Sequence, residues 1–413
     1  MSATTASRQT SSPRARFIPD LFSNHLEELA FLWGQRRVAL HAPNYFLRDF
    51  LHLNERMEAH LQGLLAVPVP LADLLLPQLL NAESRDSVFA AACPLLRLAN
   101  PELTRQVFNC FLQAEAATLP GFRDAFCFAP AATYAHELQR ILQQGAALHA
   151  AYAATALANL HVLDPGSGAL KELLLHENPV IATSAWHASV AADSQAPSVQ
   201  QPRPYQQGLA RSEPSVRDAV LKSAVCSGQT WLMPTLHQLA ATGDLSAIKW
   251  LAVTGTTAHG NLIVEQLALL ADPQQRCEIL VRFGHPGVLE VLRDWVAGGD
   301  ALLAAEAGEA FTRVSSHDVR GERIQAPVSE TADEFEREFA PLIWTTDLGK
   351  IDAYLRQNRD TLKSAHRWSR GMPLDGIASA ETLAALDLQI RWDQVARHRL
   401  AGNTASQPEP IVF

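Results

Sequence analysis

A cluster of ionisable side chains between positions 52 and 60 could bind a metal ion. It consists of His52, Glu55, Arg56, Glu58 and His60. On a helix, spacings of three and four residues place the first three of these on one face. A metal site would need a third ligand and a pocket that excludes water. Solvated ion pairs on a helix surface need neither, so the sequence predicts no metal site here.

Motifs of other catalytic or cofactor-binding sites are not found in the sequence. There is no GxSxG, no phosphate-binding P-loop and no GxGxxG. His136-Glu137 and His176-Glu177 begin like a zinc-binding helix, but neither has a second histidine four residues after the first. We therefore predict that the protein is not an enzyme and that it uses no cofactor.

Arg36 is a charged residue within an apolar helical stripe. It lies three residues after Trp33 and four residues after Leu32. A guanidinium group buried without a partner is costly, so it needs a carboxylate. Glu55 and Glu58 of the following helix are the expected partners. We predict a structural clasp between the two helices rather than a functional site.

Two groups of residues in the middle of the chain are candidates for binding a partner protein. Lys249 and Trp250 lie near the edge of one predicted helical pair, and Glu290, Arg293 and Asp294 lie on the outward face of a later helix. Exposed aromatic and arginine residues often anchor protein interfaces. The alternative is an ordinary solvated surface, which has the same composition.

A series of helix-start signals predicts the elements that position these candidates. The signals lie at Asp244, Gly260, Asp272, His285 and Asp300, at intervals of 12 to 16 residues. Aspartate caps a helix by accepting a hydrogen bond from a first-turn N–H group, and proline suits the first turn. Apolar residues at helical spacing follow each signal. We predict an α-solenoid of short helical pairs, each buried against its neighbours.

The remaining chain divides into segments of different composition. Sustained alternation of apolar and polar residues is absent, so we predict an all-α fold with few or no strands. The segments are a disordered N-terminus (1–16), an N-terminal helical hairpin (17–66), an Ala/Leu-rich helical region (67–192), a Pro/Gln-rich loop (193–214), HEAT-like repeats (215–316), an acidic linker (317–338), a C-terminal helical region (339–402) and a loose tail (403–413).

The bulk composition restricts the class of partner and the compartment. The chain has 413 residues, a net charge of −9 and five cysteines. The negative charge argues against binding to nucleic acid. No run of 18 apolar residues suggests a membrane span, and the first residues lack the apolar part of a secretory signal. The odd number of cysteines without a CxxC pair favours reduced thiols in a cytoplasmic protein.

Several segments resemble a bacterial family of uncharacterised HEAT-like helical-repeat proteins. The most specific is residues 25–64, HLEELAFLWGQRRVALHAPNYFLRDFLHLNERMEAHLQGL. Within 283–316, FGHPGVLEVLRDWV and ALLAAEAGEAFTRVSS look like the repeats of that family, and SRGMP at 369–373 is similar to a Gly-x-Pro element near its end. Asn54 departs from the family pattern, where an aspartate is expected. The Pro/Gln-rich loop has no recognised counterpart.

The resemblance implies a function in secretion, because members of this family tend to lie in gene clusters of the type VI secretion system. It implies a cytoplasmic adaptor or chaperone that helps to load an effector, with an effector or spike-associated protein as the partner. The first alternative is an immunity protein that binds and blocks a cognate toxin. The second is a lyase-like enzyme on a short helical-repeat scaffold, which would need a pocket with convergent polar groups.

Overall fold

The structure is a computed structural model that describes residues 17–130, 134–193, 202–328, 331, 333–363, 366–374 and 379–402. The described chain is mostly helical with little sheet, as the sequence predicts. It forms two compact units. Unit 1 holds the described residues up to Arg36 and those from His52 to His136; unit 2 holds Arg37–Leu51 and the described residues from Glu137 onward. The predicted disordered N-terminus and loose tail lie outside the described residues.

The predicted N-terminal hairpin is present as two helices, and further short helices follow it. Contacts between positions 25 and 60 and between 36 and 54 show that the first two helices run antiparallel. The helices are α1 (Pro19–Ala39), α2 (Leu47–Leu65), α3 (Leu71–Leu80), α4 (Arg85–Arg97), α5 (Pro101–Gln113), α6 (Leu119–Phe128) and α7 (Ala135–Gln144).

The core of unit 1 contains aromatic rings packed around a buried carboxylate. Trp33 stacks on Phe89 with 3.9 Å between ring centroids. Its indole Nε1 donates to Asp124 Oδ2 at 3.0 Å, and the carboxylate also accepts hydrogen bonds from Arg85 and Arg123. Asp124 is completely buried, and these donors offset the loss of its hydration.

Unit 2 consists mainly of short helices that pack on helices one or two places away in the sequence. Helix α12 packs on α10 and α14, α14 packs on α16, and α16 packs on α18. The helices are α8 (Ala147–Asn159), α9 (Gly168–Leu174), α10 (Pro179–Asp193), α11 (Tyr205–Leu209), α12 (Pro214–Cys226), α13 (Leu232–Ala241), α14 (Leu245–Thr254), α15 (Gly260–Leu267), α16 (Pro273–Phe283), α17 (Gly287–Ala297), α18 (Ala301–Ser315), α19 (Glu334–Glu338), α20 (Leu348–Gln357), α21 (Ala380–Ala385) and α22 (Leu388–Leu400), with 3₁₀ turns at Thr257–His259 and Thr361–Lys363.

The predicted helix starts in this unit are confirmed. The side chains of Asp244, Asp272 and Asp300 accept hydrogen bonds from first-turn N–H groups of α14, α16 and α18. Helix α15 begins at Gly260, and Pro286 directly precedes α17. The Pro/Gln-rich loop prediction needs a correction, because its described part contains α11.

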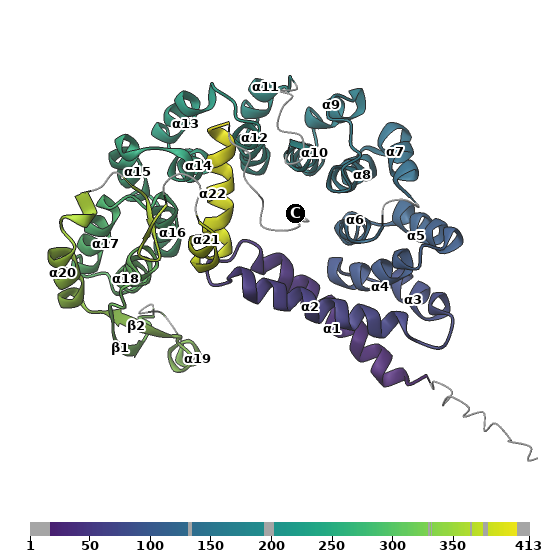
Figure 1. Cartoon of the computed structure of the whole chain (residues 1–413), viewed down its shortest axis with the longest axis horizontal. Helices are drawn as coiled ribbons and strands as arrows, with labels where there is room; N and C mark the ends of the chain where they lie inside the picture. The colour runs from purple at the N-terminus through teal and green to yellow at the C-terminus, as the bar shows by residue number, and fades with distance from the viewer. Residues whose placement is uncertain are drawn as a thin grey trace, which may run out of the picture. The chain divides into compact units, whose positions relative to one another are not determined.

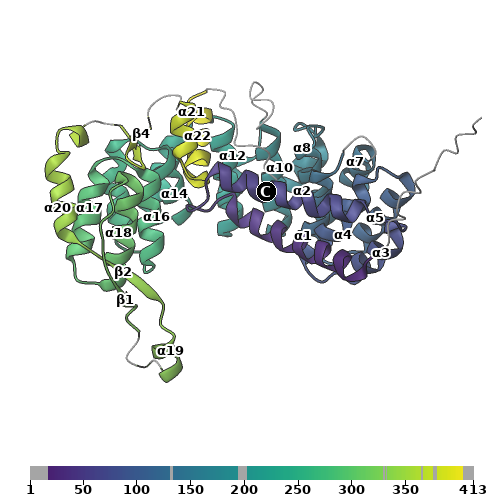
Figure 2. The ribbon, with the colours of Figure 1, turned by 60° about the horizontal axis from the view of Figure 1, so that its bottom comes forward.

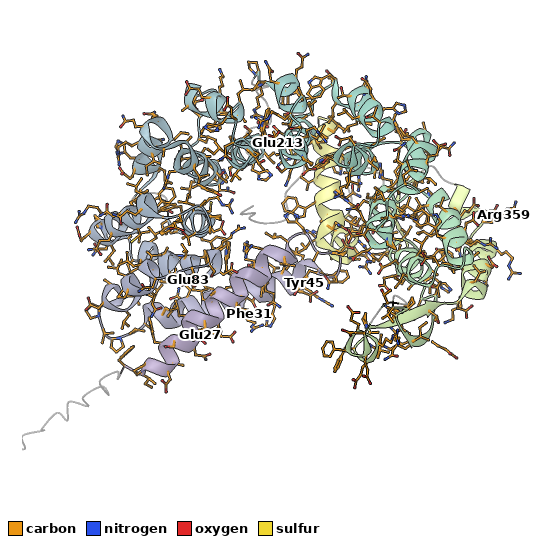
Figure 3. The ribbon with its side chains drawn as sticks, turned by 180° about the vertical axis from the view of Figure 1, so that it is seen from behind. Glu27, Phe31, Tyr45, Glu83, Glu213 and Arg359 are labelled. Carbon is orange, nitrogen blue, oxygen red and sulfur yellow. The ribbon has the colours of Figure 1, made fainter. Side chains whose placement is uncertain are left out.

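The C-terminal helix α22 lies across α12 and α14 and beside the segment that joins α1 to α2 (Figure 1). The Leu388 N–H donates to the Tyr45 carbonyl at 2.9 Å, and Figure 3 shows Tyr45 close to the start of this helix. Trp392 Nε1 donates to the Leu40 carbonyl at 2.9 Å. Residues more than three hundred positions apart in the chain are therefore neighbours in unit 2.

Two small antiparallel strand pairs interrupt the helices. Strand β1 (Arg320–Gln325) pairs with β2 (Leu342–Thr346), and β3 (Trp368–Ser369) pairs with β4 (Met372–Pro373). Strand β1 and α19 lie within the predicted acidic linker, which is therefore partly ordered structure rather than a simple connection. Figure 2 shows this ribbon and α19 projecting from the helices of unit 2. None of the described helices combines the length and the apolar character of a membrane span.

Candidate functional site

A cavity of about 740 Å³ lies within unit 2. Its volume falls in the range of sites that bind small molecules or short segments of a partner. The cavity is formed by α12, α14, α16 and α22, together with the residues just before α14 and His41 of the segment between α1 and α2. Its lining residues are His41, Pro214, Ser215, Arg217, Asp218, Lys222, Cys226, Gly243, Asp244, Leu245, Ser246, Lys249, Trp250, Arg282, Trp392, Asp393, Val395, Ala396 and Arg399.

Local helix geometry positions these side chains. Helix α12 presents Asp218, Lys222 and Cys226, which are spaced by four residues and therefore share one face. Helices α12 and α14 both begin at the cavity, because residues of their first turns contribute to its lining. Trp392, held by its bond to the Leu40 carbonyl, brings α22 over the cavity beside His41.

Charged side chains in the cavity pair with one another. Arg282 makes two bonds to the Asp393 carboxylate, at 2.9 and 2.6 Å. Arg217 Nε lies 2.9 Å from Asp244 Oδ2. The third carboxylate, Asp218, accepts a hydrogen bond from Trp250 Nε1 at 3.1 Å. Asp244 also accepts a hydrogen bond from the Ala247 N–H group at 2.9 Å, so each carboxylate in the lining has a hydrogen-bond donor from the protein itself.

The titratable groups of the lining respond to burial and positive charge. Desolvation of the imidazole, together with the charges of Lys222 and Arg282, lowers the pKa of His41 to about 4. Burial, reinforced by Arg282, lowers the pKa of Lys222. Burial raises the pKa of the Cys226 thiol. At neutral pH the imidazole is therefore uncharged and the thiol is protonated.

The structure separates the two groups of predicted partner-binding residues. Lys249 and Trp250 are half-buried and line the cavity. Glu290, Arg293 and Asp294 lie on α17 and do not line it. The Arg293 guanidinium bonds Asp352 of α20 at 3.0 Å and its neighbour Asp294 at 3.1 Å. Arg293 therefore connects two helices, whereas Glu290 is exposed.

The predicted clasp at Arg36 is correct in its burial and wrong in its partners. The Arg36 side chain is completely buried. Its Nε donates to Asn54 Oδ1 at 2.8 Å, and the guanidinium lies over the Phe128 ring at 4.8 Å from the centroid. Glu55 is exposed and contacts His52, and Glu58 bonds Arg97. Burial lowers the pKa of Arg36 to about 10, opposed by the charge of Asp124.

The predicted pairing of Arg36 with Glu55 and Glu58 is wrong because both carboxylates lie on the solvent-exposed face of α2. Position 54 faces α1 instead, and it is the position at which the family resemblance leads one to expect an aspartate. An amide there accepts the arginine bond without adding a second buried charge.

The cluster between positions 52 and 60 does not converge on one point. His60 turns toward His25 of α1, with 3.1 Å between their Nδ1 atoms, while His52 lies 3.7 Å from Glu55. Across the described residues, no group of three or more His, Cys, Asp or Glu side chains is placed to hold a metal ion.

Sequence reasoning missed most of the cavity lining. Lys222 and Arg282 interrupt apolar helical stripes, and the same pattern predicts the burial of Arg36. Applied throughout the chain, this signal would also have selected Asp393, which is 2 % exposed. No local pattern indicates that these residues and His41 meet, because four separate segments supply them.

Comparison with known proteins finds no matching family model, no matching curated protein and no matching solved structure. The family resemblance of the sequence therefore stays a prediction.

Proposed function

We propose that this protein is a non-catalytic protein-binding scaffold whose binding site is the cavity of unit 2. The observation that carries the proposal is the position of Lys249 and Trp250. The sequence indicates both as interface anchors, and both line the cavity. A tryptophan held by one hydrogen bond beside a lysine offers an apolar face and a charge to a partner.

The chemistry of the cavity favours binding over catalysis. A general base needs a carboxylate or imidazole that is available to the substrate and basic enough to take its proton. The carboxylates of the lining already pair with Arg217 or accept hydrogen bonds from Arg282 and Trp250, and the lowered pKa of His41, about 4, makes its imidazole a weak base. A nucleophilic cysteine needs a lowered pKa, and that of Cys226 is raised.

The cellular role that we propose is that of a cytoplasmic adaptor or chaperone for a type VI secretion effector. Two considerations support it: the family resemblance and the interpretation of the helical pairs as an α-solenoid, an architecture that commonly presents a binding surface. The partner would be the effector or a spike-associated protein. Nucleic acid is a poor candidate because the chain is acidic overall.

Co-expression with the products of neighbouring secretion genes tests this role. We expect one effector or spike protein to co-purify with the chain, and its secretion to be lost when the gene is deleted. Trp250→Ala should weaken capture without changing the helical circular dichroism signal. Glu290→Lys and Arg293→Glu, on α17, provide the comparison. If only these two weaken capture, the binding site lies on α17 and not in the cavity.

The same experiment separates the adaptor from an immunity protein. An adaptor must release its cargo, so moderate affinity and measurable dissociation are expected. An immunity protein must hold its toxin with slow dissociation, because protection fails whenever the toxin escapes. Rescue of cells from an otherwise lethal effector, with no loss of secretion on deletion, would reject the adaptor role.

A second candidate function, enzymatic activity, is favoured by one observation. Lys222 lines the cavity, and burial lowers the pKa of its amine. Amines of this kind can attack carbonyl compounds to form Schiff bases. Borohydride reduction in the presence of simple aldehydes and 2-oxo acids would trap such an adduct. A mass increase at Lys222, absent in Lys222→Met, would support the enzyme over the scaffold.

A further inference from the structure

The lining of the cavity carries more positive than negative charge. Its carboxylates are Asp218, Asp244 and Asp393. Its cationic side chains are Arg217, Lys222, Lys249, Arg282 and Arg399. Burial lowers the pKa of Lys222, and without it four basic side chains still outnumber the three carboxylates, in a chain whose net charge is −9. The cavity therefore differs in sign from the protein as a whole.

Two arginines outside the lining, Arg367 and Arg397, add to this excess of positive charge. Asp393 forms its direct ion pair with Arg282, at 2.6 Å. The same carboxylate also acts electrostatically on Arg367 and Arg397, whose pKa values are lowered mainly by burial. Arg367 and Arg397 donate instead to backbone carbonyls, so their positive charges add to that of Arg282 near Asp393.

The start of α12 acts in the same direction, whereas the Asp244 carboxylate already caps the start of α14. The first turns of α12 and α14 contribute Pro214, Ser215, Leu245 and Ser246 to the lining. The N-terminus of a helix carries a partial positive charge from its unpaired N–H groups. Anions are stabilised at such positions.

Lys249 is the lining cation best placed for an incoming partner. Unlike Arg217 and Arg282, it has no hydrogen bond or ion pair to any residue that the structure describes. Its neighbour Trp250 and Trp392 of α22 add aromatic surface to the same cavity. Charge and aromatic surface together suit a ligand that combines carboxylates with an apolar side chain.

We propose that the cavity binds an acidic segment of the partner protein, with carboxylates near Lys249 and the N-terminus of α12 and an aromatic side chain against Trp250 and Trp392. This inference rests on the proposed function, because it assigns the chemistry of the partner at the same site. The volume of about 740 Å³ accommodates a few side chains, so a short segment rather than a whole domain enters.

Synthetic peptides test the proposal directly. The probe is acetyl-Asp-Glu-Phe-Asp-Glu-amide, and its matched control is the uncharged acetyl-Asn-Gln-Phe-Asn-Gln-amide. Binding to the full chain is measured by isothermal titration calorimetry and by tryptophan fluorescence. We expect the acidic peptide to bind at least tenfold more tightly than the amide peptide. Equal affinities for the two peptides would overturn the proposal.

Substitutions that change the charge of single lysines test where the acidic peptide binds. Lys249→Glu should weaken binding of the acidic peptide at least tenfold, and Lys249→Gln should have a smaller effect in the same direction. Lys171→Glu, at an exposed lysine of α9 outside the cavity, is the matched control and should leave the affinity unchanged. Equal weakening by Lys249→Glu and Lys171→Glu would show a general charge effect and contradict the site.

Two further outcomes separate this inference from the proposed function. Inorganic phosphate that binds as tightly as the acidic peptide, and displaces it, would identify a small free anion as the ligand and overturn the peptide assignment. Capture of the native partner by Lys249→Glu at wild-type affinity would also overturn it, while leaving the scaffold function standing. Loss of partner capture together with loss of peptide binding supports both.

Discussion

A single charged residue within an apolar helical stripe is predicted to be buried, and Arg36 confirms this. Arg36 is completely buried between Trp33 and Phe128 and bonds Asn54. Removing Arg36 has two effects, the loss of its charge and the loss of its volume. Alanine removes both, whereas methionine removes mainly the charge.

We predict that Arg36→Ala lowers the free energy of unfolding by about 2–4 kcal/mol, because it leaves a cavity and an unpaired amide. Arg36→Met keeps most of the packing and removes a desolvated charge, so its loss should be about 1 kcal/mol or less. Urea unfolding followed by circular dichroism measures both values. Similar large losses for the two variants would show that the charge itself is essential, through Asp124.

His41 makes stability depend on pH. Its pKa is about 4 in the folded protein, compared with an ordinary value of 6.5. Between these values the unfolded chain binds a proton that the folded chain does not, so stability falls as the pH falls from about 6.5 to about 4. Because His41 keeps part of its surface exposed to solvent, His41→Gln should remove only a small part of this dependence. The measurement is the difference in unfolding free energy between pH 7.5 and pH 5 for both proteins; an unchanged difference would contradict the assignment.

Helical elements were predictable from the sequence to the extent that their signals are local. Asp244, Asp272 and Asp300 cap helices because an aspartate and the following N–H groups are adjacent in the chain. The ribbon of β1 and β2 was not predicted, because β1 is exposed along its whole length and carries no alternating pattern. The crossing of α22 over α12 and α14 depends on long-range packing that no local pattern encodes.

The segment before β3 holds two helices together through one side chain. The Arg367 guanidinium donates to the carbonyls of Ala252 and Gly255 at the end of α14. It also donates to those of Arg282 and Phe283 at the end of α16. Helix ends leave carbonyls without intrahelical partners, and a cation there is favourable. Arg367 therefore replaces water at two buried helix ends.

We predict that Arg367→Met lowers the free energy of unfolding by about 2–4 kcal/mol, because buried carbonyls lose their donor. Arg359→Met is the matched control: Figure 3 shows this arginine at the edge of the molecule, and it is exposed. Its substitution should change stability by no more than about 0.5 kcal/mol. Equal effects in chemical denaturation would show that the bonds of Arg367 contribute nothing beyond an exposed charge.

For the whole molecule, the sign of the net charge opposes the sign of the cavity. A net charge of −9 repels an acidic ligand at long range, while the lining attracts it at contact. The two effects differ in range, so salt acts on them differently. Affinity at the cavity must come from short-range pairing and not from electrostatic steering.

This difference gives a kinetic prediction for the acidic peptide. Raising the salt concentration from about 20 mM to about 200 mM shortens the screening length to less than 10 Å and removes the long-range repulsion. The association rate constant should therefore rise or stay constant. The dissociation rate constant should rise more, because ion pairs with Lys249 and its neighbours weaken, so the affinity falls. Stopped-flow tryptophan fluorescence measures both constants. A steep fall of the association rate with salt would instead indicate that an extended positive surface steers the ligand, and that the cavity is not its first point of contact.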